Sequence, residues 1–273
     1  MSLIYSYKDD EIRCKHILNM QPKQSDFKMH THDYAEVCLF LRGKGIFHVE
    51  GTEYNVDEGD ILLMRRAEAH YIEIDSSMPY ERFALHFRES LLSGIDRSGI
   101  LMRPFTDRDS GQLNLYKKTE FDEQTYNTLV KKLLENTEQK RLNIISNLIQ
   151  LMLEIKPLFD KQRSVKNINS NSVVYRILND INSNLYKQIS LDELCEKHYI
   201  SKSQLCRVFK KATGSTVWDY ITSKRLLSAR EMLGTGIAPK KVCKSCGFGD
   251  YSSFYRAYSK RFGESPKQHN NRK

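Results

Sequence analysis

Two basic segments near the end of the chain have residue types that can bind nucleic acid. They are LCRVFKKATG, residues 205–214, and FYRAYSKRFG, residues 254–263, and at an offset of 49 they match in kind almost throughout. Lysine and arginine neutralise phosphates, and arginine also forms paired hydrogen bonds with guanine. One chain could therefore contact the same DNA duplex at two places.

Positive charge is concentrated in the same part of the chain. Residues 173–273 hold 19 Lys and Arg against 8 Asp and Glu, whereas residues 1–172 hold 24 against 26. The formal net charge of +9 therefore arises wholly from the carboxyl-terminal part, where it can neutralise phosphates. A length of 273 residues favours two domains. We expect only the second of them to bind nucleic acid.

The first basic segment is predicted to be the second helix of a helix-turn-helix unit. Ser190 and Glu193 form a capping box at the start of one short helix, and Ser201 caps the next. Apolar residues then recur at positions 205, 208, 209 and 212, which is the spacing of one helix face. Two short helices joined by a tight turn, the second of them basic, are typical of a unit that enters the major groove.

A second unit repeats this pattern. Pro239 suits the first turn of its opening helix, and Cys243 matches Cys195 of the first unit. A longer helix over residues 217–233 separates the units and ends at Gly234 and Gly236. Its apolar residues, Trp218 among them, are expected in the cores on both sides.

Two such helices held by a stiff connector can contact successive major grooves on one face of a duplex, about 34 Å apart. Arg207 and Arg256 are best suited to bidentate contact with guanine, and Lys260 and Arg261 are expected at the phosphates. The alternative is that these are the solvated faces of a helical bundle. The predicted DNA-contacting residues are Ser203, Gln204, Cys206, Arg207, Lys210, Lys211, Ser252, Ser253, Tyr255, Arg256 and Lys260.

Cysteine usage and the amino terminus indicate a cytoplasmic protein. Cys243 and Cys246 form a CxxC pair, but two thiols supply only two metal ligands and the repeat explains both as helix-core positions. The six cysteines are scattered, and MSLIYSYKDDEIR lacks the pattern of a signal peptide. The most apolar segment is too short and too polar to span a membrane. We therefore expect reduced thiols and no membrane partner.

The amino-terminal part is predicted to be a small β-sandwich or barrel followed by two helices. Between residues 27 and 88, short runs such as VCLFL and DILLM alternate with turn signals such as RGKG and DEGD. The segment 92–118 indicates no particular element. Helical periodicity begins at Tyr126 and again at Leu142, and part of the second apolar stripe could face another subunit. This favours a homodimer; the alternative is that both helices cover the barrel.

Domain boundaries follow from a polar stretch, DKQRSVKNINSNS. Its Asn and Ser content and its few apolar residues are typical of a linker. We predict an amino-terminal domain over residues 1–160, a linker over residues 161–172 and a helical domain over residues 173–273. The predicted fold class is thus α+β with two domains.

The carboxyl-terminal part resembles the AraC/XylS transcriptional regulators. LDELCEKHYISKSQLCRVFKKATG, YITSKRLLSAREML and VCKSCGFGDYSSFYRAYSKRFGESPKQH look like the family's two helix-turn-helix units and its connecting helix. The resemblance implies recognition helices at residues 202–211 and 251–260, binding to double-stranded promoter DNA and contact with RNA polymerase. Most relatives activate transcription. The most specific signature residues are Gly247, Phe248, Phe254, Tyr258, Phe262, Gly263, Ser265 and Pro266.

The amino-terminal part is similar to the cupin-type sensor domains of such regulators. HTHDYAEVCLFLRG has the H-x-H-x3-E-x6-G spacing of the first cupin motif. Of the second motif, Gly59 and His70 fit, whereas Arg65, Ala67 and Ile74 replace its Pro, Gly and Asn. The resemblance implies a cupin-like β-barrel.

This resemblance leaves two interpretations of the histidines. As metal ligands, His30, His32, Glu36 and His70 would suit Zn, Fe, Ni or Mn, provided that second-shell partners exist. As the mouth of an effector pocket, they would bind a sugar or another small polar metabolite instead. The candidate ligand-binding residues are His30, His32, Tyr34, Glu36, Phe40, His48, His70 and His86, with Phe87 as a further wall.

The favoured function is a ligand-responsive transcriptional regulator that is not an enzyme, activates transcription and needs no cofactor. An effector in the barrel would alter DNA binding through its different affinity for two conformations. The alternatives are a metal-dependent cupin enzyme fused to a DNA-binding domain, and a constitutive DNA-binding protein with an inert barrel.

Overall fold

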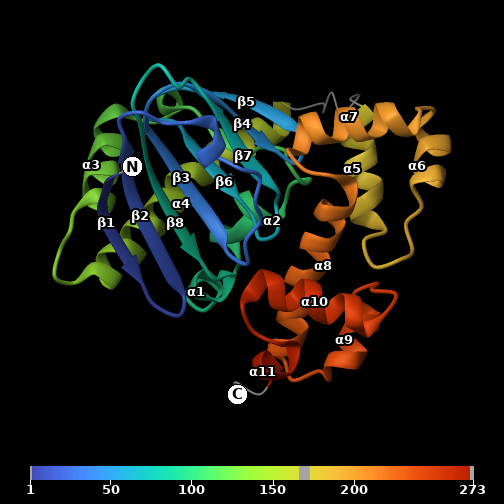
Figure 1. The fold of residues 1–273 in the computed structure, drawn as a ribbon. Helices are drawn as coiled ribbons and strands as arrows, with labels where there is room; N and C mark the ends of the chain where they lie inside the picture. The colour runs from blue at the N-terminus through green and yellow to red at the C-terminus, as the bar shows by residue number, and fades with distance from the viewer. Residues whose placement is uncertain (1, 166–172, 271–273) are drawn as a thin grey trace. The chain divides into compact units, whose positions relative to one another are not determined.

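The computed structural model describes residues 2–165 and 173–270. The chain divides into two compact units, Met1–Asn169 and Ser170–Lys273. The first is rich in strands and the second is helical, as the ribbon in Figure 1 shows. The predicted two-domain α+β class is confirmed.

The strands of the first unit form two antiparallel sheets. The larger has the order β1-β2-β8-β3-β6-β9 and the smaller the order β5-β4-β7, so the predicted barrel takes the form of two facing sheets. Neighbours in the larger sheet come from distant parts of the sequence, which brings β3 beside β8. The strands are β1 (Ser2–Lys8), β2 (Ile12–Asn19), β3 (Ala35–Arg42), β4 (Gly45–Val49), β5 (Thr52–Val56), β6 (Ile61–Met64), β7 (His70–Ile74), β8 (Tyr80–Phe87) and β9 (Leu115–Tyr116).

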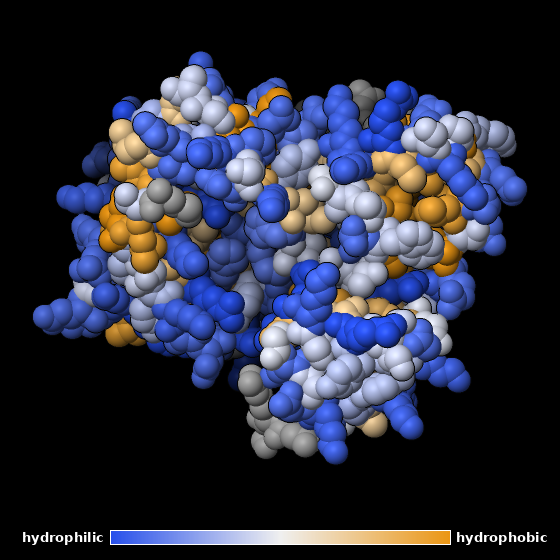
Figure 2. Space-filling view, in the orientation of Figure 1, coloured by the Kyte–Doolittle hydropathy of each residue, from blue (hydrophilic) through white to orange (hydrophobic). Residues whose placement is uncertain are grey.

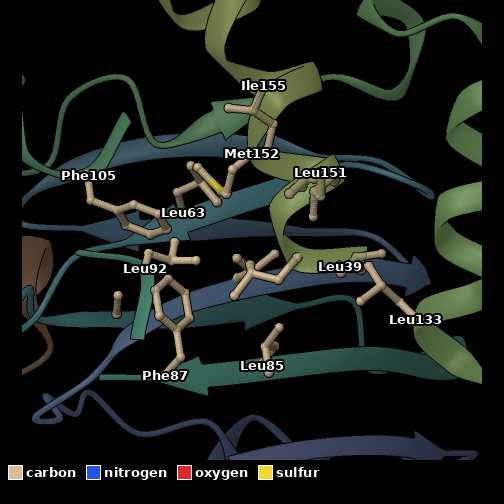
Figure 3. Close-up of a cluster of buried hydrophobic side chains, with 14 of the residues drawn as sticks. Leu39, Leu63, Leu85, Phe87, Leu92, Phe105, Leu133, Leu151, Met152 and Ile155 are labelled. Carbon is tan, nitrogen blue, oxygen red and sulfur yellow. The ribbon is translucent and has the colours of Figure 1, made fainter. Parts of the chain in front are cut away.

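The central strand β3 is buried on both faces, because helices cover one face of the large sheet and the small sheet covers the other. Its sequence AEVCLFLR therefore lacks the polar alternation of a half-exposed strand. Leu39 points to the helices and packs in the cluster that Figure 3 shows, with Leu63, Leu85 and Met152. Cys38 and Phe40 point to the small sheet, where they pack with Phe47 and other residues.

Two long helices, α3 (Glu123–Leu134) and α4 (Lys140–Val165), follow the strands as predicted. Leu148, Leu151 and Ile155 of α4 are fully buried against the large sheet, whereas Leu142 and Leu153 are 69% and 53% exposed. Helix α4 continues through residues 161–165, the first part of the predicted linker. Residues 166–172 of the predicted linker lie outside the described residues.

The unassigned segment 92–118 contains several short elements. The chain forms α1 (Glu89–Ser93), a 3-10 turn at Ile100–Met102, α2 (Arg103–Thr106), β9 and a second 3-10 turn at Lys118–Glu120. Another 3-10 turn, Gln24–Asp26, precedes β3. Phe105 and Leu101 are buried in the same core as the α4 stripe, so tertiary packing holds these elements.

The second unit contains the two predicted helix-turn-helix motifs. Its helices are α5 (Val173–Ser183), α6 (Leu191–His198), α7 (Lys202–Thr213), α8 (Val217–Gly234), α9 (Pro239–Ser245), α10 (Tyr251–Phe262) and α11 (Pro266–Asn270). Phe209 of α7 packs edge to face on Tyr220 of α8, with ring centroids 5.4 Å apart. Among the described residues, no helix is both long enough and apolar enough to cross a membrane.

The second motif has its own core, to which α8 contributes Leu226 and Leu233. Cys243 and Cys246 are buried there among apolar residues, as the helix-core interpretation of the CxxC pair expects. Trp218 corrects one prediction: it is 46% exposed on α8 rather than buried in a core.

Candidate DNA interface and histidine cluster

Helix α7 presents the first set of predicted DNA-contacting residues. The Ser201 side chain accepts a hydrogen bond from the Gln204 backbone N–H and caps the helix start, and Gly214 ends the helix with a φ of 70°. Leu205 and Phe209 are buried, so the opposite face turns outward. The exposed residues of this face include Ser203, Gln204, Cys206, Arg207, Lys210 and Lys211.

Helix α10 repeats the arrangement. The Asp250 carboxylate accepts a 2.8 Å hydrogen bond from the Ser253 N–H, and Gly263 ends the helix with a φ of 71°. The Arg256 guanidinium donates to Ser253 Oγ at 3.4 Å. In Figure 2 the surface over α9 and α10 is mostly blue and white. The exposed predicted residues here are Ser252, Ser253, Tyr255, Arg256 and Lys260.

Arg261 does not face outward as predicted. It is half-buried, donates to Ser223 Oγ of α8 at 3.2 Å and lies over the Phe262 ring. Burial lowers the pKa of Arg261, and the neighbouring Arg230 lowers it further. Arg261 therefore joins α10 to α8 and is not available to phosphates in this arrangement.

The turns between the paired helices are equivalent in the two motifs. The Ile200 N–H donates to the Cys195 carbonyl, and the Phe248 N–H donates to the Cys243 carbonyl, both at 3.1 Å. These are the bonds of a Schellman motif, which needs a left-handed residue just before the donor. The second motif places Gly247 there with a φ of 76°, whereas the first places Tyr199 with a φ of 54°.

Arg225 of α8 ties the two motifs together. Its guanidinium donates to the carbonyls of Leu185 and Lys187 in the first motif, at 2.8 and 2.7 Å, and to the Gly247 carbonyl in the second motif at 2.7 Å. A Cβ atom on Gly247 would lie 2.6 Å from the Tyr186 carbonyl oxygen, so these backbones touch directly. We name Arg225, Gly247 and residues 185–187 the Arg225 bracket. It adds contacts between the two motifs to the connection that the α8 backbone already provides.

Helix α8 separates the two recognition helices. Its 18 residues span about 27 Å at a rise of about 1.5 Å per residue. Helix α7 packs near its start and α10 packs on its later residues (Figure 1). Helices α7 and α10 therefore pack on different parts of α8, as two helices that contact successive major grooves about 34 Å apart require.

In the first unit, five polar side chains from different elements meet at the end of the barrel interior. Glu36 of β3 lies opposite His86 of β8 in the strand register. His70 begins β7 and is joined to His30 by two backbone hydrogen bonds of 3.1 Å. His32 follows on the same segment. We name His30, His32, Glu36, His70 and His86 the histidine cluster.

The cluster converges on one carboxylate oxygen. Oε2 of Glu36 lies 2.7 Å from Nε2 of His32, 3.2 Å from Nε2 of His70 and 3.3 Å from Nε2 of His86. The rings of His30 and His70 are in contact, with centroids 4.4 Å apart. The side chains of Glu36 and His70 are only 2% and 1% exposed.

Backbone carbonyls set the tautomers of three of these rings. Nδ1 of His30 lies 3.0 Å from the Lys28 carbonyl oxygen, and Nδ1 of His32 lies 2.9 Å from the Tyr34 carbonyl oxygen. Nδ1 of His70 lies 2.9 Å from the Glu68 carbonyl oxygen. A carbonyl oxygen only accepts, so each Nδ1 carries the hydrogen. In a neutral ring, Nε2 then holds a lone pair.

Charge in the cluster is carried by the carboxylate. Burial would raise the pKa of Glu36, but His86 and the close contacts with His32 and His70 hold it well below its usual range. Burial lowers the pKa of His32. Burial also opposes charge on His70, but the contacts with Glu36 outweigh it and raise the pKa of His70. The cluster therefore favours the ionised form of the Glu36 carboxylate.

A buried ion pair between Glu68 and Arg108 supports the histidine cluster. Glu68, whose carbonyl holds His70, accepts two hydrogen bonds from the Arg108 guanidinium at 2.7 and 2.8 Å and one from the Gly111 N–H at 2.9 Å. Both charged side chains are fully buried. Burial would raise the pKa of Glu68, but Arg108 lowers it to about 2. The segment 108–111 thus fixes the residue that orients His70.

The other predicted ligand-binding residues lie away from the cluster. His48 is on the opposite face of β4 from Phe47 and stacks on Tyr71, with ring centroids 4.4 Å apart. Phe87 points to the helices and packs on Phe105. These two placements correct the predicted pocket, because adjacent residues on a strand point to opposite faces.

Phe40 and Tyr34 keep only an indirect relation to the cluster. Phe40 points into the barrel interior but packs on Tyr80 in the apolar core. The Tyr34 ring lies 4.5 Å from the guanidinium of Arg13 and 5.4 Å from that of Arg88, while its carbonyl holds His32. Arg13 is the cross-strand partner of His86, so a basic side chain lies beside the cluster.

Two family models match the chain. The model of an AraC-like ligand binding domain matches residues 20–176, which is more than half of the chain. The model of a helix-turn-helix domain matches residues 194–272. The chain belongs to the AraC family. It is a transcriptional regulator with a ligand-binding and a DNA-binding domain, and the histidine cluster lies within the AraC-like ligand binding domain.

Relatives of similar length support the AraC assignment. The probable transcriptional regulator LumQ of Photobacterium leiognathi is 26% identical over 245 residues, covering 87% of this chain and 89% of that protein. The transcriptional activator RhaR of Mannheimia succiniciproducens is 21% identical over 252 residues, covering 91% and 89%. Among solved structures, the C-terminal domain of the response regulator yesN from Fusobacterium nucleatum is 30% identical with a TM-score of 0.34, covering 35% of this chain and 95% of that one.

Sequence reasoning missed the role of Arg225 in this AraC-family chain. An arginine lying between Ile221 and Ala229, on a helix expected to supply cores on both sides, was the available signal. A charged side chain at such a position must find buried partners. Its partners are three backbone carbonyls, which no pattern of residue types in the sequence can indicate.

Proposed function

We propose that this chain is an effector-responsive transcription activator that binds promoter DNA through α7 and α10. The observation that carries the proposal is the repeated, capped helix with exposed basic residues, held at one spacing by α8 and the Arg225 bracket. The name of RhaR, a transcriptional activator, supports the sign of the regulation. Contact with RNA polymerase and a cytoplasmic location belong to the same proposal.

The two recognition helices have different kinds of side chain for different tasks. Arg207 and Arg256 lie in the middle of their exposed faces and can form bidentate bonds with guanine in the major groove. Lys211 and Lys260 lie in the last turn of each helix, where an ammonium group suits phosphate. A protein built in this way binds all DNA weakly and its target sequence tightly.

The first unit is proposed to sense a small polar effector, such as a sugar. The histidine cluster offers an anion and imidazoles, and Arg13 and Arg88 beside Tyr34 add hydrogen-bond donors. An effector acts on DNA binding only as far as its affinity differs between two conformations of the protein. The effector would therefore bind more tightly to the DNA-bound form.

We further infer a homodimer formed through α3 and α4. Leu142 and Leu153 are exposed on α4, and a surface groove of about 450 Å³ lies between the helices, lined by Leu129 and Leu153 among others. A second copy of the same face would cover these leucines. Sedimentation of the full chain tests this, and a monomer at all concentrations would contradict it.

The DNA contacts are tested with selected target DNA and random DNA in parallel. Arg207→Ala or Arg256→Ala should weaken binding to target DNA by about 1 to 3 kcal/mol and relax the preference at one position. Lys211→Ala should weaken binding to both DNAs alike and reduce the salt dependence by about one counterion. Equal losses on random and target DNA for both arginine variants would refute their assignment as base readers.

A further inference from the structure

We propose that the effector of the first unit carries an anionic group, a carboxylate or a phosphate, that binds to Arg82 inside the barrel. This rests on the proposed function and narrows its effector to a small hydroxylated acid, such as a sugar acid or a sugar phosphate, rather than a neutral sugar. It follows from the direction in which Arg82 points and from the ion-pair partner that Arg82 lacks.

Arg82 lies on β8 with its side chain on the face that points to the small sheet. In the strand register it is opposite Ile17 of β2 and Phe40 of β3, and both of these residues pack in the core between the two sheets. Directly paired residues on neighbouring strands share a face. The next residue, Phe83, packs on the helix side, as the alternation of a strand requires. Arg82 therefore places a guanidinium in the barrel interior.

The guanidinium of Arg82 has no ion-pair partner among residues 2–165 and 173–270. Arg108 shows the usual arrangement in the same unit, since its buried guanidinium is paired with Glu68. A charge in a protein interior without such a partner is costly. The Tyr80 hydroxyl interacts with Arg82, but it is itself buried and has no hydrogen bond of ordinary length in the described part of the chain. The arginine and the phenol are therefore available to a ligand.

The guanidinium keeps its positive charge in this position. Burial would lower the pKa of Arg82, but Tyr80 and the other groups near it outweigh this effect and raise the pKa. A planar guanidinium presents paired N–H donors to the oxygens of a carboxylate or a phosphate. Weak screening in a protein interior strengthens the attraction between the two charges. An anion bound to Arg82 would therefore supply the missing partner.

Short side chains separate Arg82 from the histidine cluster. Ala84 and His86 follow Arg82 on the same face of β8, and Ala84 is paired with Cys38 of β3. The Cα atoms of Arg82 and His86 are about 13 Å apart, at about 3.3 Å per residue. A small hydroxylated acid can bridge this interval, with its anionic group at Arg82 and its hydroxyl groups at the cluster. The reverse orientation is unfavourable, because the anionic group would meet the ionised Glu36 carboxylate.

Basic side chains beside the histidine cluster suit the same class of effector. Arg13 of β2 is exposed and lies opposite His86 in the strand register. The guanidiniums of Arg13 and Arg88 lie 4.5 and 5.4 Å from the centroid of the Tyr34 ring. In the described part of the chain, neither of them forms an ion pair with a carboxylate. Positive charge at this end of the barrel attracts an anion and raises its rate of association.

Thermal melting of the full chain without ligand is the first test of Arg82. Arg82→Met removes an unpaired interior charge and keeps most of the length of the side chain, so this variant should melt about 2 to 4 °C above wild type. Arg108→Met in the same unit is the comparison. It should melt below wild type, because it leaves the buried Glu68 carboxylate without its partner. If Arg82→Met melts at or below the wild-type temperature, Arg82 has a structural role and the proposal is overturned.

Matched pairs of small molecules provide the second test, at constant ionic strength. D-glucose is compared with D-glucuronate and with D-glucose 6-phosphate, and other sugars are compared with their acids and phosphates in the same way. We expect at least one acid or phosphate, but not its neutral counterpart, to raise the melting temperature of wild type. Arg82→Met should weaken this binding at least about thirtyfold. Arg42→Met is the matched control, because it removes an exposed charge opposite Glu81 on the same sheet and should bind as wild type does.

The outcomes separate the anionic effector from the proposed function. Stabilisation by a neutral sugar that Arg82→Met retains, or the absence of any stabilising acid or phosphate, overturns the anionic effector. Equal affinity of wild type and Arg82→Met for the acid or phosphate overturns Arg82 as its partner. Binding to target DNA is measured separately, with and without each stabilising compound. A compound that binds through Arg82 but leaves the affinity for DNA unchanged contradicts the effector response and leaves the anion site in place.

Discussion

The Arg225 bracket predicts that the two recognition helices bind DNA as one rigid unit. Arg225→Lys keeps the positive charge but replaces a planar group with three carbonyl partners by one ammonium group. The ammonium group can retain one of the three contacts in this geometry. The contact between residues 185–187 and Gly247 would then loosen, and α8 alone would connect the motifs.

The magnitude follows from the bonds that are lost. A hydrogen bond from a charged donor contributes about 1.5 to 3 kcal/mol, so two lost bonds amount to about 3 to 6 kcal/mol before relaxation. Arg225 is 8% exposed, so water can reach part of the site and recover some of this loss. We expect Arg225→Lys to reduce the free energy of unfolding by about 2 to 4 kcal/mol.

The assay compares DNA with two half-sites and DNA with one. Since each recognition helix keeps its own side chains, binding to a single half-site should change little in Arg225→Lys. Binding to the full site should weaken by about tenfold or more, because the second contact loses its high effective concentration. The full-site DNA should also become more tolerant of a changed spacing between the half-sites.

Arg230→Lys serves as the control, since Arg230 lies on the same helix and packs on Phe262 within the second motif only. It should affect half-site and full-site binding in the same proportion. If Arg225→Lys also weakens both DNAs in the same proportion, or leaves the preferred spacing as sharp as in wild type, the bracket does not set the geometry and the reasoning is refuted.

Two smaller predictions concern the first helix-turn-helix motif. Asp180 receives hydrogen bonds from Lys197 at 2.7 Å and His198 at 3.3 Å; burial opposes its ionisation, but these partners outweigh it and lower the pKa of Asp180 from 3.8. Its contribution is therefore present above pH 3.8 and lost as pH falls through the lower folded pKa. Asp180→Asn should cost about 1 kcal/mol in urea unfolding at pH 7, and an undiminished difference from wild type near pH 2 would contradict this. Tyr199→Gly should stabilise the protein by about 1 kcal/mol, because Tyr199 is left-handed yet 94% exposed. Unchanged or lower thermal stability would count against that account.

The helices of the second unit could be predicted because their signals are local. Caps at Ser201 and Thr216, terminal glycines and apolar spacing all agree within each helix, and the repeat supplies a second example. Exposure of the DNA-contacting residues follows directly from burial of the opposite face. This reasoning does not hold for Arg261. Its long side chain turns back to Ser223 and does not point outward from the helix face on which its Cα atom lies.

The strand-rich unit could be predicted only in outline. The alternation of strands and turns indicates two sheets, but it does not tell which face of β4 or β8 points to the other sheet. A shift of one residue in the predicted alternation swaps the faces of Phe47 and His48 on β4, and those of His86 and Phe87 on β8. The short elements between residues 89 and 120 have no strong helix or strand propensity of their own. Contacts with α4 hold them in place.

The buried Glu68 and Arg108 pair gives the segment between α2 and β9 an influence on a site it does not touch. Glu68 holds His70 through its carbonyl while its carboxylate is held by Arg108 and the Gly111 N–H. A substitution in that remote segment can therefore tilt one imidazole and leave the other four members of the histidine cluster in place. Selection could in this way change the effector specificity of a regulator without changing any residue that contacts the effector.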